Sequence, residues 1–167
     1  WALQAGGSAH RLAALSGDLA TDHDGARLRA AGIPAATITT GSACHLDARL
    51  VHHALQHLDL GAADPLVIET VGNLVRPASY DLGGAAAVAL SVTEGEDKPL
   101  KYPTVFHRAD LVLLTKIDLL PHLPGFRMAV LEDALARTMP RLRVIPISAV
   151  TGEGLPEWIA WLEEQRG

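Results

Sequence analysis

Short, uninterrupted apolar runs are the feature that most limits how this 167-residue chain can fold. Three of them, at 64–69, 86–92 and 110–115, show no alternation of polar and apolar residues. A strand needs such a run when both of its faces are covered, as in a parallel sheet between two layers of helices. Two further strands are predicted at 35–39 and 142–147.

Helical stretches alternate with these strands along the chain. The clearest covers 46–58, where leucine, valine and alanine recur on one side at the helical period, opposite histidine and arginine. Three more helices are predicted at 24–31, 127–138 and 155–164. This order predicts the α/β fold class: a doubly wound, mostly parallel sheet with helices on both faces.

Length and composition favour one globular domain over residues 1–167. The 14 basic and 19 acidic residues give a net charge of -5, and the basic ones are scattered, so nucleic acid is not an expected partner. Cys44 is the only cysteine, which excludes an intrachain disulfide and favours a cytoplasmic location. No apolar run approaches the roughly 18 residues of a membrane helix, so no membrane association is expected.

The segment Thr115-Lys116-Ile117-Asp118 directly follows a predicted strand, where open α/β sheets bind ligands. It resembles the guanine-recognition motif of GTPases, usually Asn-Lys-x-Asp, with Thr115 in place of Asn. The Asp118 carboxylate would accept hydrogen bonds from N1 and N2 of guanine, which adenine cannot offer, while the Lys116 stem covers the base. The alternative is a strand end with a solvated lysine and an aspartate that caps a helix.

A second segment, 147–154, lies about 30 residues further on, again between a predicted strand and a helix. It resembles the second guanine-binding loop of GTPases, in which the Ala149 N–H would donate to O6 of the base and Ser148 would brace the loop. The alternative is that 151–154 is only a turn before the last helix. Order and spacing relative to the first motif favour GTP as the ligand.

Two acidic residues at or just after strand ends suit a magnesium ion beside phosphate, since Mg²⁺ prefers oxygen ligands. They are Asp18, after Gly17, and Glu69, which occupies the place of a Walker B acid. Shortly after Glu69, the N–H of Gly72 could reach a γ-phosphate. Each acid could instead cap a turn.

Longer segments are similar to the hydrogenase nickel-incorporation GTPases, the HypB-type maturation factors. They are 17–22, 40–48, 71–79 and 91–103. The resemblance covers nearly the whole chain. It implies a GTP-hydrolysing metallochaperone that acts as a homodimer and helps insert nickel into [NiFe] hydrogenase, with hydrogenase maturation proteins and the hydrogenase large subunit as partners. Urease-accessory nickel GTPases rank second, because they usually have Cys-Pro-His where this chain has Cys44-His45.

The family's glycine-rich phosphate loop, ending in Gly-Lys-Ser/Thr, has no counterpart in the sequence. The only lysines are Lys98, Lys101 and Lys116, all placed elsewhere. Two interpretations stay open: an N-terminally incomplete chain, or a degenerate homologue that serves as a non-catalytic binding or interaction module. Loss of a strand from the middle of such a sheet would also expose unpaired edges.

The resemblance implies a nickel or zinc site at a dimer interface, built from a Cys-His pair, two helical histidines and a second cysteine. Cys44, His45 and His53 match that set. Arg49 stands at the first helical histidine position and Arg76 at the second cysteine position. Because a guanidinium cannot ligate a metal and repels one, we expect a weakened site. The alternative is a small buried cysteine beside a solvated helix face.

Overall fold

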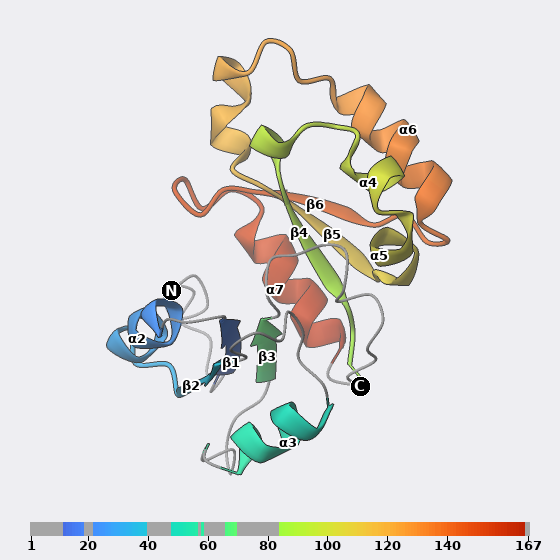
Figure 1. The fold of residues 1–167 in the computed structure, drawn as a ribbon. Helices are drawn as coiled ribbons and strands as arrows, with labels where there is room; N and C mark the ends of the chain where they lie inside the picture. Colours follow the sequence, from blue (N-terminus) through green and yellow to red (C-terminus); the bar gives the residue numbers. More distant parts are fainter. Residues whose placement is uncertain are drawn as a thin grey trace. The chain divides into compact units, whose positions relative to one another are not determined.

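The computed structural model describes residues 12–18, 22–39, 48–56, 58, 66–69 and 84–165 (Figure 1). Contacts between Cα atoms divide the chain into two compact units, with the boundary between residues 83 and 84. The single domain expected over residues 1–167 stays a prediction.

The first unit contains a parallel three-stranded sheet. Its strands, in the order β2-β1-β3, are β1 (Ala13–Asp18), β2 (Ala35–Thr39) and β3 (Leu66–Glu69). In the register of the sheet, Ser16 of the central strand is level with Thr37 on one side and with Glu69 on the other. The strand that ends at Asp18 therefore has a neighbour on both sides.

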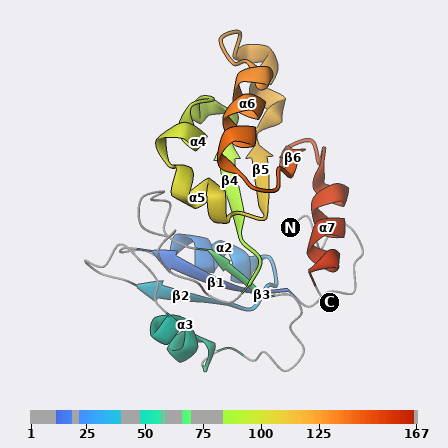
Figure 2. The same cartoon turned by 90° about the vertical axis from the view of Figure 1, so that its right-hand side faces the viewer.

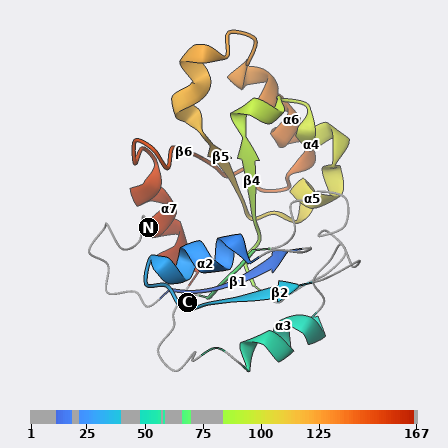
Figure 3. The same cartoon turned by 60° about the vertical axis from the view of Figure 1, so that its left-hand side comes forward.

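Helices α2 (His23–Ala30) and α3 (Ala48–Leu55) cover opposite faces of this sheet (Figure 3). Val51 of α3 packs against Leu15 and Ile38 on one face. Leu28 of α2 packs against Ala14 on the other face. The alternation of side chains along β1 thus supplies both small cores.

The second unit contains another parallel three-stranded sheet, in the order β4-β5-β6. Its strands are β4 (Ala87–Ser91), β5 (Leu111–Thr115) and β6 (Val144–Ile147). The central strand β5 is buried over 111–114, as a strand covered on both faces must be.

Helical segments cover both faces of this second sheet (Figure 2). They are the 3₁₀ segments η2 (Val92–Glu94) and η3 (Ile117–His122) and the helices α4 (Lys98–Lys101), α5 (Pro103–Arg108), α6 (Met128–Thr138) and α7 (Leu155–Glu164). The larger core joins Val112 and Leu114 to Phe106 of α5 and Leu135 of α6. On the other face, Trp161 of α7 packs against β5 and β6.

The predicted fold class is confirmed: both sheets are parallel, with helices on both faces. Two predicted strands are less covered than their apolar sequences indicate. In β3, Leu66, Val67 and Ile68 are half-buried and Glu69 is exposed. Ala87 and Ala89 of β4 are exposed, because β4 has β5 as its only hydrogen-bonded neighbour in the described sheet and Trp161 of α7 packs over β5 and β6. Among the described residues, no helix has the length and apolarity needed to cross a bilayer.

Candidate functional site

Two loops follow neighbouring strands of the second sheet and therefore start at the same edge. In the register of the parallel strands β5 and β6, Thr115 is level with Ile147. The residues that come next are Lys116 after β5 and Ser148 after β6. Open α/β sheets bind their ligands at the carboxyl ends of the strands, where these loops lie.

A hydrogen bond joins the two predicted guanine motifs. The Ser148 hydroxyl donates to Oδ1 of Asp118 over 2.6 Å, although the residues are 30 positions apart in the sequence. Ser148 is fully buried and Asp118 is half-buried. A short hydrogen bond to a carboxylate from a buried donor fixes the orientation of the carboxylate.

The same serine also organises its own loop. Its Oγ accepts hydrogen bonds from the N–H groups of Val150, over 3.2 Å, and Thr151, over 3.1 Å. Its backbone carbonyl accepts from the Gly152 N–H over 2.9 Å. Ala149 is an exposed residue, and within the described part of the chain its N–H has no hydrogen-bond acceptor.

Lys116 has an unusual backbone conformation. It is the only non-glycine residue of the described ranges with a positive φ, at 61° with ψ at 35°. This left-handed conformation costs an L-residue about 1–2 kcal/mol. Backbone strain of this kind concentrates at functional sites. The strained residue is Lys116, the lysine that was predicted to cover the base.

Thr115, the residue in place of the usual asparagine, has its hydroxyl turned toward the neighbouring strand. Its Oγ1 donates to the Leu90 carbonyl of β4 over 3.4 Å. This contact ties β5 to β4 directly before Lys116. The structure therefore gives Thr115 a bracing contact within the sheet.

The turn expected before the last helix is present and needs glycine. Gly152 and Gly154 have φ values of 83° and 73°. A Cβ on Gly154 would overlap the Pro146 carbonyl oxygen of β6. The segment is thus both a tight turn into α7 and the support of the Ser148 loop.

In the first unit, the structure describes one complete side chain of the predicted magnesium set. Glu69, at the end of β3, is exposed, and its Oε2 accepts a hydrogen bond from the hydroxyl of Ser16 over 2.9 Å. Asp18 ends β1, and its side chain lies outside the described part. Gly72 lies outside the described residues.

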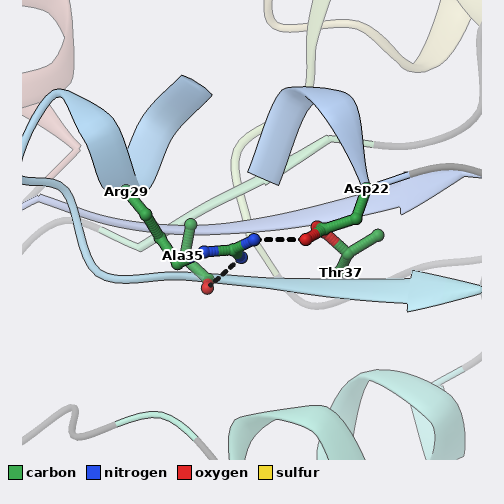
Figure 4. Close-up of polar contacts among 4 residues, drawn as sticks. All are labelled: Asp22, Arg29, Ala35 and Thr37. Carbon is green, nitrogen blue, oxygen red and sulfur yellow. Dashed lines mark hydrogen bonds and ion pairs between the residues drawn. The ribbon is translucent and has the colours of Figure 1, made fainter. Parts of the chain in front are cut away.

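A polar cluster that the sequence analysis missed anchors the start of α2 (Figure 4). The carboxylate of Asp22 accepts hydrogen bonds from the Thr37 hydroxyl of β2 and from the guanidinium of Arg29. Arg29 also donates to the Ala35 carbonyl over 3.1 Å. The hydrogen bond from Thr37, followed by that from Arg29, lowers the pKa of Asp22. A Cβ at position 25 would collide with the side chains of Asp22 and Thr37, so the cluster needs Gly25. This glycine inside a predicted helix was the one sequence feature that could have indicated the cluster.

The predicted nickel or zinc ligands fall mostly outside the described part. His53 lies on α3 and is exposed, as is Arg49 on the same helix. Cys44, His45 and Arg76 lie outside the described residues. Among the residues that the structure does describe, no three histidine, cysteine, aspartate or glutamate side chains gather in the way that a nickel or zinc site built from protein ligands requires.

Comparison with known proteins gives a consistent picture. The sequence profile of the "CobW/HypB/UreG, nucleotide-binding domain" family matches residues 3–146. The hydrogenase maturation factor HypB of Azotobacter vinelandii is 58% identical over 157 residues, covering 93% of this chain and 52% of that protein. The hydrogenase/urease maturation factor HypB of one Helicobacter pylori strain is 40% identical over 161 residues, covering 93% of this chain and 66% of that protein.

Two solved structures of HypB proteins are also similar to this chain. HypB from Helicobacter pylori in complex with nickel has a TM-score of 0.87 and 38% identity, covering 93% of this chain and 74% of that one. HypB from Archaeoglobus fulgidus has a TM-score of 0.85 and 35% identity, covering 98% and 79%. The chain spans about half the length of the first curated relatives it matches. This chain therefore belongs to the CobW/HypB/UreG family of nucleotide-binding domains and, within that family, to the HypB type.

Proposed function

We propose that the second unit binds the base of a guanine nucleotide at the carboxyl edge of its sheet. Asp118 accepts from N1 and N2 of guanine, the Ala149 N–H donates to O6, and the Lys116 stem covers the base. The observation that carries this proposal is the 2.6 Å hydrogen bond between Ser148 and Asp118, which brings the two motifs together.

The selectivity for guanine follows from the donors and acceptors at this edge. Ser148 holds Oδ1 of Asp118, and Oδ2 has no partner within the described residues. Two carboxylate oxygens and one free N–H match the two donors and the one acceptor of guanine. Adenine presents an amino group where guanine has O6, so it would face the Ala149 N–H with another donor.

We further propose that Asp18 and Glu69 serve Mg²⁺ and the γ-phosphate during GTP hydrolysis, with Gly72 near the phosphate. The carboxylate of Glu69 supplies the oxygen donors that this ion prefers, and it is exposed at the end of β3. When bound, the ion would neutralise phosphate charge. The printed sequence contains no Gly-Lys-Ser/Thr loop, so hydrolysis by these 167 residues alone is not expected.

The relatives' names give hydrogenase maturation as their role, and one of the similar solved structures is a complex with nickel. We propose that the protein binds nickel or zinc through Cys44, His45 and His53 and acts as a homodimer. Its proposed partners are hydrogenase maturation proteins and the hydrogenase large subunit, and its proposed location is the cytoplasm. The name of the Helicobacter pylori relative includes urease, which favours a urease-accessory role as the second candidate. A non-catalytic interaction module is the third, because of the missing phosphate loop.

Titration of the ¹⁵N-labelled chain with GMP and AMP tests the base site, since monophosphates carry the base without the triphosphate. We expect GMP, and not AMP, to shift the amide signals of Lys116, Asp118 and Ala149. Lys116→Ala should weaken GMP binding, whereas Lys101→Ala, which removes an exposed lysine paired with Asp97, should not. Equal shifts with both nucleotides would refute guanine recognition.

Calorimetry with GTP tests the consequence of the missing loop. Without the lysine of a Gly-Lys-Ser/Thr loop, several phosphate charges are not neutralised. We therefore expect weak binding, with a dissociation constant for GTP above about 100 μM. A micromolar constant would mean that another segment holds the phosphates.

A further inference from the structure

Ser16 is a buried hydroxyl in the central strand of the first sheet. Its side chain donates to Oε2 of Glu69 over 2.9 Å, and the residue is only 3% exposed. We propose that Ser16 is a positioning residue, which holds the Glu69 carboxylate so that its second oxygen can take a divalent cation. This inference rests on the proposed role of Glu69 toward Mg²⁺.

The backbone around this contact is fixed on both sides. Ser16 is level with Glu69 on β3 and with Thr37 on β2, so parallel pairing holds its strand from two directions. Glu69, in contrast, lies at the end of an edge strand of the described sheet and is exposed. The hydrogen bond therefore connects the long, flexible side chain of Glu69 to the central strand of the sheet.

The residues around Ser16 indicate that its hydroxyl is present for Glu69. The preceding positions of β1 are Ala13, Ala14 and Leu15, all buried and apolar. Alanine at position 16 would suit this interior without a hydroxyl to satisfy, because a buried hydroxyl is costly unless it is hydrogen-bonded. The hydroxyl of Ser16 finds its partner in Oε2 of Glu69.

Orientation of a carboxylate matters for cation binding. A glutamate that is already held loses less side-chain freedom when its other oxygen meets the ion. Within the described residues, Oε1 of Glu69 has no hydrogen-bond partner, so it is open to such a ligand. Partners that orient a metal ligand change metal affinity by about 10- to 100-fold when they are removed.

A purely structural role for Ser16 makes a different prediction. If the hydrogen bond only satisfies a buried hydroxyl, then Ser16→Ala changes the stability of the first unit and leaves cation binding unaltered. If Ser16 positions Glu69, cation affinity falls even in variants that keep their fold. Ser16→Cys keeps the size of the side chain but is a weak donor, and Ser16→Thr keeps the hydroxyl.

Mn²⁺ titration of the 167-residue chain distinguishes these roles. Free Mn²⁺ is counted by electron paramagnetic resonance, and line broadening of amides at the ends of β1 and β3 locates the bound ion. We expect Glu69→Gln to abolish this broadening, Ser16→Ala and Ser16→Cys to weaken Mn²⁺ binding about 10-fold, and Ser16→Thr to restore it. Ser91→Ala, which removes a buried serine of the second unit, should leave Mn²⁺ binding unchanged.

The outcomes separate this inference from the function on which it rests. If Glu69→Gln still binds Mn²⁺ normally, or millimolar Mn²⁺ broadens no amide of the unaltered chain, then the proposed role of Glu69 is wrong. If Glu69→Gln abolishes binding but Ser16→Ala binds as tightly as the unaltered chain, only the role of Ser16 is overturned.

Discussion

Replacing Ser148 by alanine should destabilise the second unit by about 2–3 kcal/mol. The fully buried hydroxyl donates to Asp118 and accepts from the N–H groups of Val150 and Thr151. A hydrogen bond to a charged group is worth about 1.5–3 kcal/mol, and one between neutral groups about 0.5–1.5 kcal/mol. Val150 and Thr151 are exposed, so water can replace the hydrogen bonds that their N–H groups lose. The lost hydrogen bond to half-buried Asp118 therefore accounts for most of the destabilisation.

Urea unfolding followed by tryptophan fluorescence measures this loss. Two of the three tryptophans, Trp158 and Trp161, lie on α7, and a Trp1→Phe background removes the third. Thr138→Val is the control, because its hydroxyl bonds only to carbonyls of its own helix, and it should cost less than about 0.5 kcal/mol. If Ser148→Ala also lowers the free energy of unfolding by less than about 0.5 kcal/mol, the structural account of the two loops is refuted. Even one ordinary hydrogen bond contributes about 1 kcal/mol net.

Three further predictions concern other parts of the chain. Gly154→Ala should unfold the second unit or cost more than about 3 kcal/mol in urea, because φ is 73° and a Cβ overlaps the Pro146 carbonyl, whereas Gly125→Ala, with open space around it, should be neutral. The hydrogen bond from Arg143 lowers the pKa of Glu164, so this carboxylate stabilises the fold above its ordinary pKa of about 4.5, and the contribution is lost as the pH falls through its lowered pKa. Glu164→Gln should therefore reduce the loss of stability below about pH 4.5. Arg49→His with Arg76→Cys should tighten nickel binding in competition with a chromogenic chelator, and no change would mean that the arginines are not at the metal site.

The continuous apolar run at 110–115 predicted the buried strand β5, because such a run needs two covered faces. Asp18 was predicted to lie at or just after a strand end, but the extent of β1 was not predicted, because Ser16 and Gly17 interrupt the apolar pattern of Ala13–Asp18. The hydrogen bond to Glu69 makes Ser16 tolerable inside the sheet, and such a tertiary contact has no signal in local sequence. Helices α4 and α5 were missed because each is too short for a helical period to show.

In the candidate site, too, some features were predicted from the sequence and others were not. Order and spacing predicted which residues would gather, and Ser148 with Asp118 does gather in the structure. No pattern announced the left-handed backbone of Lys116 or the unpaired N–H of Ala149, because both depend on how the loops close. Exposure of Ala87 and Ala89 was also unpredictable, since it depends on which strands α7 covers.

Base preference of the Asp118→Asn variant tests the central claim most directly. In that variant the amide donates to the 2-oxygen of xanthine, where the carboxylate accepts from the 2-amino group of guanine. NMR titration of the 167-residue chain with GMP and XMP should show a preference for GMP in the unaltered chain and for XMP in the variant, each by about 10-fold, the effect of about 1.4 kcal/mol. Equal affinity for GMP before and after the substitution would contradict the assignment of Asp118 to the base.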